Sequence, residues 1–314
     1  MLIYFLRRVA LGLAIMAVVI FFLFTMLHII PGDPSVVALG QHATLAMRAA
    51  FRASMGLDLP LPIQYFRFLG HVLTGDLGTD IWSGQKVSAV VLQVLPNTII
   101  LAITSLFWSV LLGVVLGCIA ALRRGRAADW LIGLLSVGLV GVPSFLVALF
   151  LLLVFAVHLN WLPAIGAGEP GNLSSQIQAL ILPSLAVGLG WVGYTARMVR
   201  GAMLSALQES YIRTFRAFGI AEWRIVSVHA LRQAMLAIVP VIATGFGGLL
   251  SGAVFAEIVF ARPGIGALTY EAVSTRNFPI VMGAALVTTA LYITAMIAAD
   301  MLVAWLDPRV REAL

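Results

Sequence analysis

Six long stretches of this sequence carry almost no charge, and each is long enough to cross a lipid bilayer. The first, Val9 to Ile30, contains no formally charged residue, and a helix needs about 20 apolar residues to span the hydrocarbon core. The other five cover about 97–122, 130–158, 179–198, 235–256 and 279–305. Only 10% of the 314 residues are charged, whereas a soluble domain has about 25%. Because a backbone in lipid must satisfy its own hydrogen bonds, we expect an all-α membrane protein with six transmembrane helices.

The first apolar stretch differs from a cleaved signal peptide. It follows Arg7 and Arg8, as the core of a signal peptide would. However, it is longer than the about 7–15 residues of such a core, and it runs into "HIIPGDP" rather than a small-residue cleavage site. We therefore predict a retained first helix. In the third stretch, Pro143 predicts a kink, because proline removes a backbone donor.

The arginines predict the orientation of the chain, because loops on the cytoplasmic side carry an excess of basic residues. Four of the six basic residues assigned to the outside lie in one long loop, where this rule is weak. An even number of spans puts both termini on the same side, and the excess of arginine predicts that this side is cytoplasmic. The basic residues assigned to the inside are Arg7, Arg8, Arg123, Arg124, Arg126, Arg197, Arg200, Arg213, Arg216, Arg224, Arg232, Arg309 and Arg311.

The predicted spans divide the chain into four parts. Residues 1–30 form an N-terminal arm and the first span, and 31–95 form a large first external loop. A core of five further spans covers 96–306, with a cytoplasmic loop at about 200–233, and 307–314 form a cytoplasmic tail. The external loop is rich in turn sequences such as "PGDP" and "TGDLGTD", and "IQYFRFLGHVL" within it predicts a short amphipathic helix.

The cytoplasmic loop contains the densest cluster of charge in the chain. Its apolar residues from Leu204 to Phe218 are spaced by three or four, which predicts one face of an amphipathic helix over 203–218. Gly219 suits the left-handed position that ends a helix, and a second helix is expected to start near Ala221. This pattern fits either a connector lying on the membrane surface or a docking element with aromatic and arginine contacts.

The loop resembles the cytoplasmic "EAA" loop of importer-type ABC transporter permeases, in particular those for dipeptides, oligopeptides and nickel. The match is carried by "YIRTFRAFG" at 211–219 and "HALRQA" at 229–234. Phe215 stands where the family has an alanine, and Phe218 where it has a lysine. Further matches are "IIPGDP", "GLDLPLPIQY", "GDLGTD", "LPNTI", "GVPSF", "NWLPAIG", "AEIVFARPGIG" and "LDPRV", in the family's order over nearly the whole chain.

The resemblance implies a permease subunit of an ATP-driven importer in the inner (plasma) membrane. Its expected partners are a second homologous permease, two ABC ATPase subunits, an external solute-binding protein and the lipid bilayer. This chain is expected to bind no cofactor, while the ATPase subunits hydrolyse ATP with Mg. Di- or oligopeptides are the expected substrates, with a nickel chelate, glutathione or another small solute as alternatives. The residues expected to couple the permease to the ATPase are Leu207, Glu209, Tyr211, Arg213, Thr214, Phe215, Arg216, Ala217, Phe218, Gly219 and Glu222.

Other residues suggest sites outside this loop, each with a structural alternative. Four residues lie near the outer end of the fifth span: Glu257, Pro263, Gly264 and Gly266. They are candidates for an external gate or a contact for the binding protein, and the structural alternative is a stable loop. Asn97 and Asp300 are candidates for the translocation path. Alternatively, Asn97 caps the second span, and Asp300 marks a hydrated helix terminus.

Several function classes find no support in the sequence. There is no P-loop, no HExxH and no GxSxG motif, so no catalytic residues are assigned. The one cysteine and the scattered histidines predict no metal site, and the positions of the arginines argue against nucleic-acid binding. A self-contained channel, an intramembrane enzyme and a structural scaffold remain as alternatives of other classes.

Overall fold

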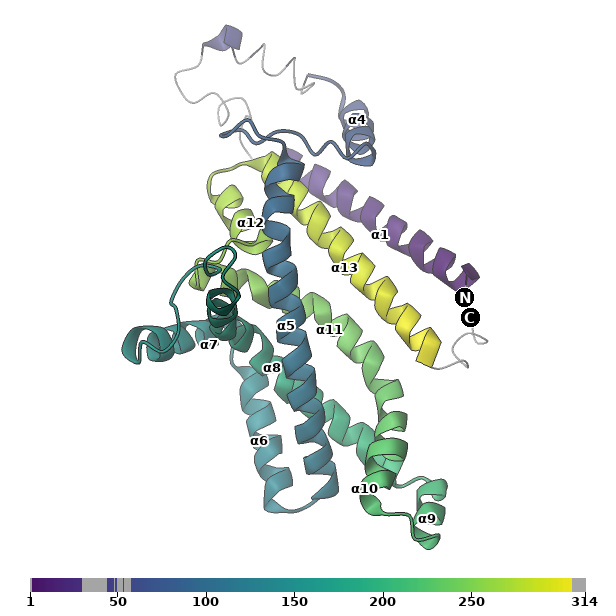
Figure 1. Ribbon diagram of the computed structural model, residues 1–314. Helices are drawn as coiled ribbons and strands as arrows, with labels where there is room; N and C mark the ends of the chain where they lie inside the picture. The colour runs from purple at the N-terminus through teal and green to yellow at the C-terminus, as the bar shows by residue number, and fades with distance from the viewer. Residues whose placement is uncertain (1, 30–43, 48, 50–52, 54–57, 307–314) are drawn as a thin grey trace. The chain divides into compact units, whose positions relative to one another are not determined.

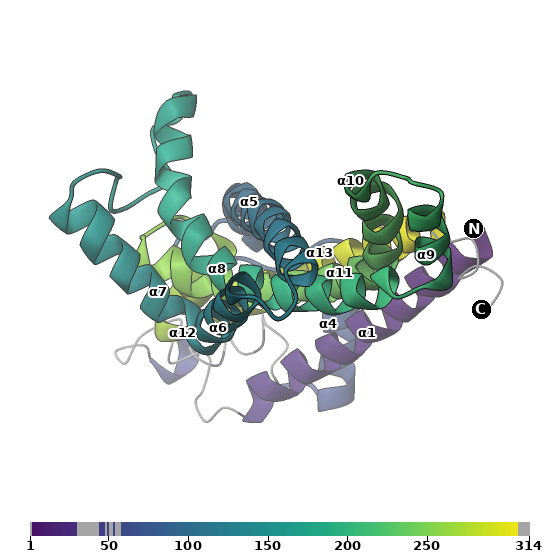
Figure 2. The same cartoon turned by 90° about the horizontal axis from the view of Figure 1, so that it is seen from below.

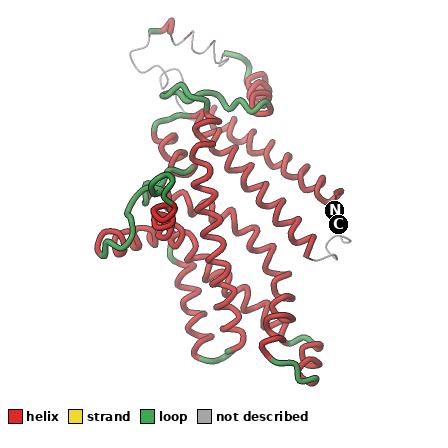
Figure 3. The backbone as a smooth tube through the Cα atoms, viewed as in Figure 1, coloured by secondary structure: helices red, strands yellow, loops and turns green. Residues whose placement is uncertain are grey.

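The computed structural model describes residues 2–29, 44–47, 49, 53 and 58–306. Within these residues the chain is helical and forms no strand, apart from an isolated bridge between Thr79 and Lys86 (Figure 3). The predicted turn "PGDP" and the predicted tail at 307–314 lie outside the described residues. The helices are α1 (Leu2–Ile29), α4 (Leu61–Leu73), α5 (Val87–Leu122), α6 (Ala127–Gly141), α7 (Ser144–Leu151), α8 (Leu173–Leu207), α9 (Ser210–Ala217), α10 (Glu222–Arg224), α11 (Leu231–Val259), α12 (Ile265–Ser274) and α13 (Phe278–Leu306).

Two π-helical segments extend these helices. The segment Leu152–His158 continues α7 as a π-helical turn, and Ile225–Ala230 joins α10 to α11 in the same way. Both segments belong to continuous helical stretches, so the second helix predicted for the loop at about 200–233 leads directly into α11, as the sequence predicts.

Four helical segments are long and apolar enough to cross a membrane: Tyr4–Met26, Val87–Leu122, Leu173–Leu207 and Phe278–Met301. The pair of helices Ala127–Gly141 and Ser144–His158 raises the number to five if it is counted as one broken span. Helix α11 contributes a shorter apolar segment, Gly245–Val259. The prediction of an all-helical membrane protein is therefore confirmed.

The third predicted span is broken rather than kinked. The axes of Ala127–Gly141 and Ser144–His158 differ by 98°. Pro143 precedes α7, and Val142 before it is extended, with φ −90° and ψ 121°. A residue before proline is pushed out of the α region, and this ends α6 at Gly141.

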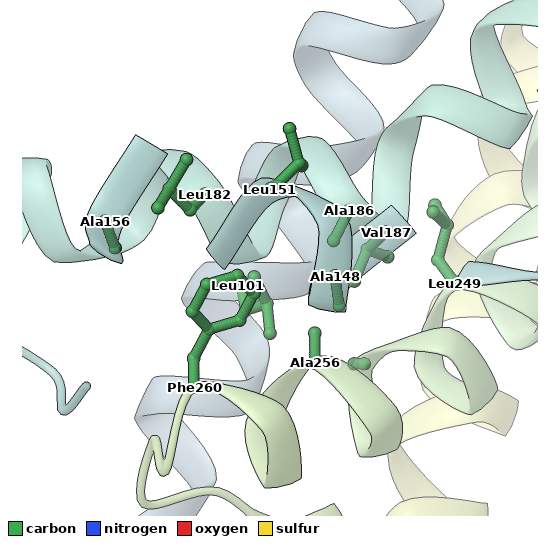
Figure 4. Packing of buried hydrophobic residues seen from close by; sticks show 11 residues of the cluster. Leu101, Ala148, Leu151, Ala156, Leu182, Ala186, Val187, Leu249, Ala256 and Phe260 are labelled. Carbon is green, nitrogen blue, oxygen red and sulfur yellow. The ribbon is translucent and has the colours of Figure 1, made fainter. Parts of the chain in front are cut away.

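Contacts divide the chain into two units, the first of which comprises Met1–Phe5, Asn97–Ala267 and Thr294–Leu314. In this unit α5 and α6 are joined by a short turn and run antiparallel (Figure 1). Its core is apolar, with Leu101 of α5, Ala148 of α7, Val187 of α8 and Ala256 of α11 converging on one cluster (Figure 4).

Small residues allow the helices of this unit to pack closely, as is common in membranes. A side chain at Gly113 of α5 would come within 2.6 Å of Thr195 of α8. Likewise, a side chain at Gly193 of α8 would come within 2.6 Å of the Ser136 carbonyl oxygen of α6. Helix α8 is therefore the central helix against which α5 and α6 both pack.

The second unit comprises Leu6–Pro96 and Leu268–Ile293. The amphipathic helix predicted within residues 31–95 is confirmed as α4, and its Tyr65 and Phe68 rings contact Phe24 of α1, with centroids 5.4 and 6.3 Å away. Asp80 accepts hydrogen bonds from Ser83 and from the side chain of Asn277, which ties the turn at 80–83 to the segment before α13. The described residues of the predicted loop at 31–95 thus contain ordered elements rather than turns alone.

Candidate functional site

The loop predicted at about 200–233 contains a separate short helix, not the end of a longer one. Helix α8 ends at Leu207, and α9 begins at Ser210 after a turn at Gln208 and Glu209. The continuous helix predicted over 203–218 is therefore divided in two. The turn is closed by hydrogen bonds from Gln208 N to Ser205 O and from Glu209 N to Ala206 O, and it lets α9 leave the axis of α8.

One face of α9 packs against the rest of the chain. Ile212 is fully buried, in a cluster with Met203 of α8 and Ile225 of the following turn. The ring of Phe215 lies 5.7 Å from that of Tyr211 and 4.4 Å from that of His229, measured between centroids. Tyr211 and Phe215 are thus half-buried and pack α9 against the rest of the chain, and their coupling to an ATPase stays a prediction.

Helix α9 ends in a Schellman motif centred on Gly219. Ile220 N donates to Phe215 O at 3.1 Å, and Gly219 N donates to Arg216 O at 3.0 Å. These two bonds satisfy carbonyl groups that the helix end leaves open. Gly219 has φ +73°, a left-handed conformation that residues with a side chain adopt at a cost. The predicted helix stop at Gly219 is confirmed.

An ion pair closes the turn between α9 and α10. Arg216 Nε lies 3.1 Å from Glu222 Oε2, and Arg216 Nη2 lies 2.6 Å from Glu222 Oε1. The two parallel bonds fix the angle of both side chains. The hydrogen bond from Arg216 lowers the pKa of Glu222 below its ordinary value, so the pair stays charged at neutral pH. Both side chains remain about half exposed to solvent.

The opposite face of this loop presents aromatic side chains to solvent. Phe218 is 79% exposed and Trp223 is 67% exposed. The Arg224 guanidinium carbon lies 5.5 Å from the centroid of the Trp223 ring, and Arg213 is exposed on α9. Trp223 is absent from the residues that the sequence suggests, because it lies beyond the amphipathic helix predicted over 203–218. Figure 2 shows α9 and α10 together at the edge of their unit.

At the opposite end of α11, Glu257 is wholly buried and holds the start of α12. Its carboxylate accepts hydrogen bonds from Thr98 Oγ1 at 2.6 Å, Gly266 N at 2.8 Å and Ala267 N at 3.1 Å. Thr98 Oγ1 in turn accepts from Ile265 N at 2.9 Å. A carboxylate at a helix N-terminus satisfies open N–H groups and opposes the positive end of the helix dipole.

This geometry favours the structural interpretation of the Glu257 segment. Gly264 and Gly266 are buried, and only Pro263 of the four residues suggested here is exposed. Glu257 exposes no surface in this conformation, so its side chain offers no direct contact to a binding protein. Thr98 was missed by sequence reasoning, because 159 residues separate it from Glu257.

The two candidates for the translocation path lie inside helices. Asn97 is half-buried ten residues after the first residue of α5, so it does not cap that helix, and the prediction of a cap is wrong. The helix begins earlier because the preceding sequence, from Val87, is also apolar. Asp300 is half-buried within α13. A role for either residue in permeation stays a prediction.

A second ion pair, largely buried at its Asp129 end, joins α6 to α8. Arg200 Nε lies 2.5 Å from Asp129 Oδ1, and Arg200 Nη2 lies 2.8 Å from Asp129 Oδ2. Neither residue belongs to the candidate sites above. Sequence reasoning did not pair them, because 71 positions separate them in the chain. Among the described residues, no group of three or more His, Cys, Asp or Glu side chains is placed to hold a metal ion.

The helices and the two units define the class of this protein as a multi-pass, all-helical membrane protein. The chain belongs to the family of binding-protein-dependent transport system inner membrane components, whose model matches residues 113–312, and a model of the family's N-terminal part matches residues 1–102.

Known relatives extend over the whole chain. A putative peptide permease from Brucella ovis is 36% identical over 317 residues, covering 99% of both chains. The glutathione transport system permease GsiC from Salmonella paratyphi A is 35% identical, also with 99% of both chains covered. The probable D,D-dipeptide permease DdpB from Escherichia coli is 35% identical over 91% of each chain.

Among solved structures, the MetNI methionine ABC transporter in inward-facing form has a similar fold, with a TM-score of 0.53 and 18% identity. The match covers 69% of this chain and 96% of that one. Together the relatives and the family model identify this chain as a permease subunit of an ABC importer, which works with ATPase and binding-protein partners. It is a transport protein and not an enzyme.

Proposed function

We propose that the chain crosses the inner membrane six times. The six spans are α1, α5, the broken pair from α6 to His158, α8, α11 and α13. Support comes from the length of α11, which covers Leu231–Val259, a longer stretch than its apolar segment Gly245–Val259. With six spans, the excess of arginine near α9 and the α5–α6 turn places these segments and both termini in the cytoplasm.

We further propose that the segment from Ser210 to Arg224 transmits movement from an ATPase subunit to the spans. The observation that carries this proposal is its two-sided packing. Ile212 and Phe215 attach the segment to the core, while Phe218 and Trp223 are left exposed. An element that transmits force needs a firm attachment on one side and an accessible contact on the other. Exposed aromatic and arginine side chains are the types that dominate protein interfaces.

The complete importer in this proposal contains two permeases, two ATPase subunits and an external binding protein. This chain holds no nucleotide, and the ATPase subunits bind and hydrolyse ATP with Mg. Closure of the ATPase dimer pulls on α9, and α9 is fixed to α8 and α11 through the cluster of buried residues around Ile212. The rigid attachment lets a movement at the membrane surface change the access to a path between the permeases.

The substrate class that fits best is a di- or oligopeptide. Relatives at 34–36% identity over nearly the whole chain include permeases named for peptides, for glutathione and for D,D-dipeptides, and glutathione is itself a small peptide. A nickel chelate is the alternative within the same class. Binding of a peptide library to the cognate solute-binding protein distinguishes these substrates directly.

The coupling proposal is tested by removing the two exposed aromatic side chains. The double variant Phe218→Ala/Trp223→Ala should lower co-purification of the ATPase subunits at least tenfold, because hot-spot aromatics each contribute about 2 kcal/mol or more. Phe107→Ala is the matched control, since Phe107 is 70% exposed on α5, away from this loop. Co-purification is measured on the full complex in detergent, together with ATP-driven uptake in vesicles.

Equal ATPase recovery from the double variant and the control would reject the coupling proposal. The alternative classes give other results in the same vesicles. A self-contained channel would transport without ATPase subunits, an intramembrane enzyme would convert its substrate, and a scaffold would give no substrate-stimulated ATP hydrolysis.

A further inference from the structure

A cavity of about 710 Å³ opens between α6 and α8 beside the α5–α6 turn. Figure 1 shows this turn at the same end of its unit as α9. The lining of the cavity has two chemically different parts. Arginines and one acid surround the end near the turn, and apolar side chains of α6 form the wall leading away from it. The charged residues of the lining are Arg126, Asp129, Arg197 and Arg200.

The end near the turn carries a positive charge that the chain does not neutralise. The Asp129 carboxylate is occupied by Arg200 at 2.5 and 2.8 Å and by the Gly125 N–H at 3.0 Å. Arg126 and Arg197 are exposed, and within the described part of the chain neither forms an ion pair or a side-chain hydrogen bond. Three arginines against one acid leave a charge of +2 around the opening.

The apolar wall follows one face of α6 away from the turn. Trp130, Leu134 and Val137 recur at steps of four and three residues, which places them along one side of the helix. Each is more than half exposed, at 69%, 55% and 57%. A side chain added at Gly133 would meet nothing within 4 Å. The cavity is therefore an open apolar groove along α6 that begins at a basic end.

We propose that this cavity binds an anionic phospholipid. The phosphate group lies against Arg126 and Arg197, and one acyl chain lies along Gly133, Leu134 and Val137. Guanidinium groups pair well with phosphate oxygens, and basic pockets between membrane helices are suited to anionic head groups. A soluble phosphate would use only the basic end, whereas a phospholipid satisfies both parts of the lining. The Asp129–Arg200 ion pair is a positioning contact that holds α6 at its distance from α8.

The proposed topology is needed only to assign the lipid site to a leaflet of the membrane. With that topology, the site lies in the cytoplasmic leaflet. Trp130 is consistent with this depth, because tryptophan is enriched where membrane and water meet. The second permease is the competing occupant, and the experiment must therefore include the assembled complex.

The test uses the full-length chain and the full importer, each in nonionic detergent, with native mass spectrometry of bound lipid. Phosphatidylglycerol and phosphatidylcholine are supplied at equal concentration. In wild type we expect bound phosphatidylglycerol to exceed phosphatidylcholine. In Arg126→Gln/Arg197→Gln its occupancy should fall at least fivefold, since one arginine near an anionic surface accounts for about that factor. Arg123→Gln/Arg124→Gln makes the same change in charge on the same turn, outside the cavity lining, and should bind as wild type.

A further variant tests the apolar wall without a change in charge. Gly133→Leu fills the open groove and should lower phosphatidylglycerol binding as strongly as the loss of both arginines. Soluble glycerol 3-phosphate should not displace the lipid. Equal loss in both arginine pairs, no loss in Gly133→Leu, displacement by glycerol 3-phosphate, or absence of the lipid from the assembled importer would each overturn the proposal. None of these measurements depends on ATP hydrolysis, so their failure leaves the coupling proposal untouched.

Discussion

At the scale of single residues, the Glu257 carboxylate decides which side chains its neighbours can have. A Cβ at Gly264 would overlap the carboxyl group of Glu257. We expect Gly264→Ala to lower the free energy of unfolding by about 1–3 kcal/mol, as overpacking of a filled site does. Gly201→Ala is the control, because a Cβ there meets nothing within 4 Å. Thermal unfolding of the two variants in the same detergent measures the difference, and equal midpoints would contradict the close packing at Glu257.

The Asp80 turn gives a prediction on pH. Burial raises the pKa of Asp80, but hydrogen bonds from Ser83, Asn277 and the backbone of Trp82 outweigh it, so the pKa lies below its ordinary value. A lowered pKa means that the stabilisation is complete above the unfolded pKa of about 3.9 and is lost as the pH falls through the folded value. Asp80→Asn should therefore lower the unfolding midpoint equally at pH 6 and pH 8, with a smaller difference below about pH 4. A difference that grows on acidification would refute this.

At the scale of elements, the end of α9 depends on the backbone of Gly219. Its φ of +73° costs a side-chain-bearing residue about 1–2 kcal/mol, and asparagine tolerates it better than a β-branched residue. We expect Gly219→Val to displace α9 and to reduce substrate-stimulated ATP hydrolysis at least fivefold in the reconstituted importer. Gly219→Asn should keep most of this activity. If valine and asparagine behave alike, the left-handed turn does not position α9.

The local elements could be predicted from sequence because their causes are local. The stop at Gly219, the amphipathic α4 and the interruption at Pro143 each follow from residues within one or two turns. The division between α8 and α9 at Gln208 could not be predicted, since the residues around it continue the helical spacing. The inward position of Phe215 was missed for another reason: its partner His229 belongs to a different helical segment.

At the scale of the whole molecule, topology is open to a labelling experiment. The chain has one cysteine, so Cys118→Ser provides a cysteine-free background. In that background Ser210→Cys, at the start of α9, should react with a membrane-impermeant maleimide only after the membrane is opened. Ser83→Cys, in the external loop, should react in intact cells. Both positions are exposed. Labelling of Ser210→Cys in intact cells would contradict both the orientation and the coupling role of α9.

The sequence by itself determined that this protein is a helical membrane protein, because several uncharged stretches of about 20 residues are stable as helices in a lipid bilayer. Its motifs were also sufficient for the family, since they recur in order along one chain. Only the tertiary structure decided which aromatic side chains of the loop between α8 and α11 are buried and which are exposed. It also decided that Glu257 meets Thr98 and that Asp129 meets Arg200. These pairs arise from the packing of helices far apart in sequence, and the spacing of residues within one helix carries no information about the helix that it contacts.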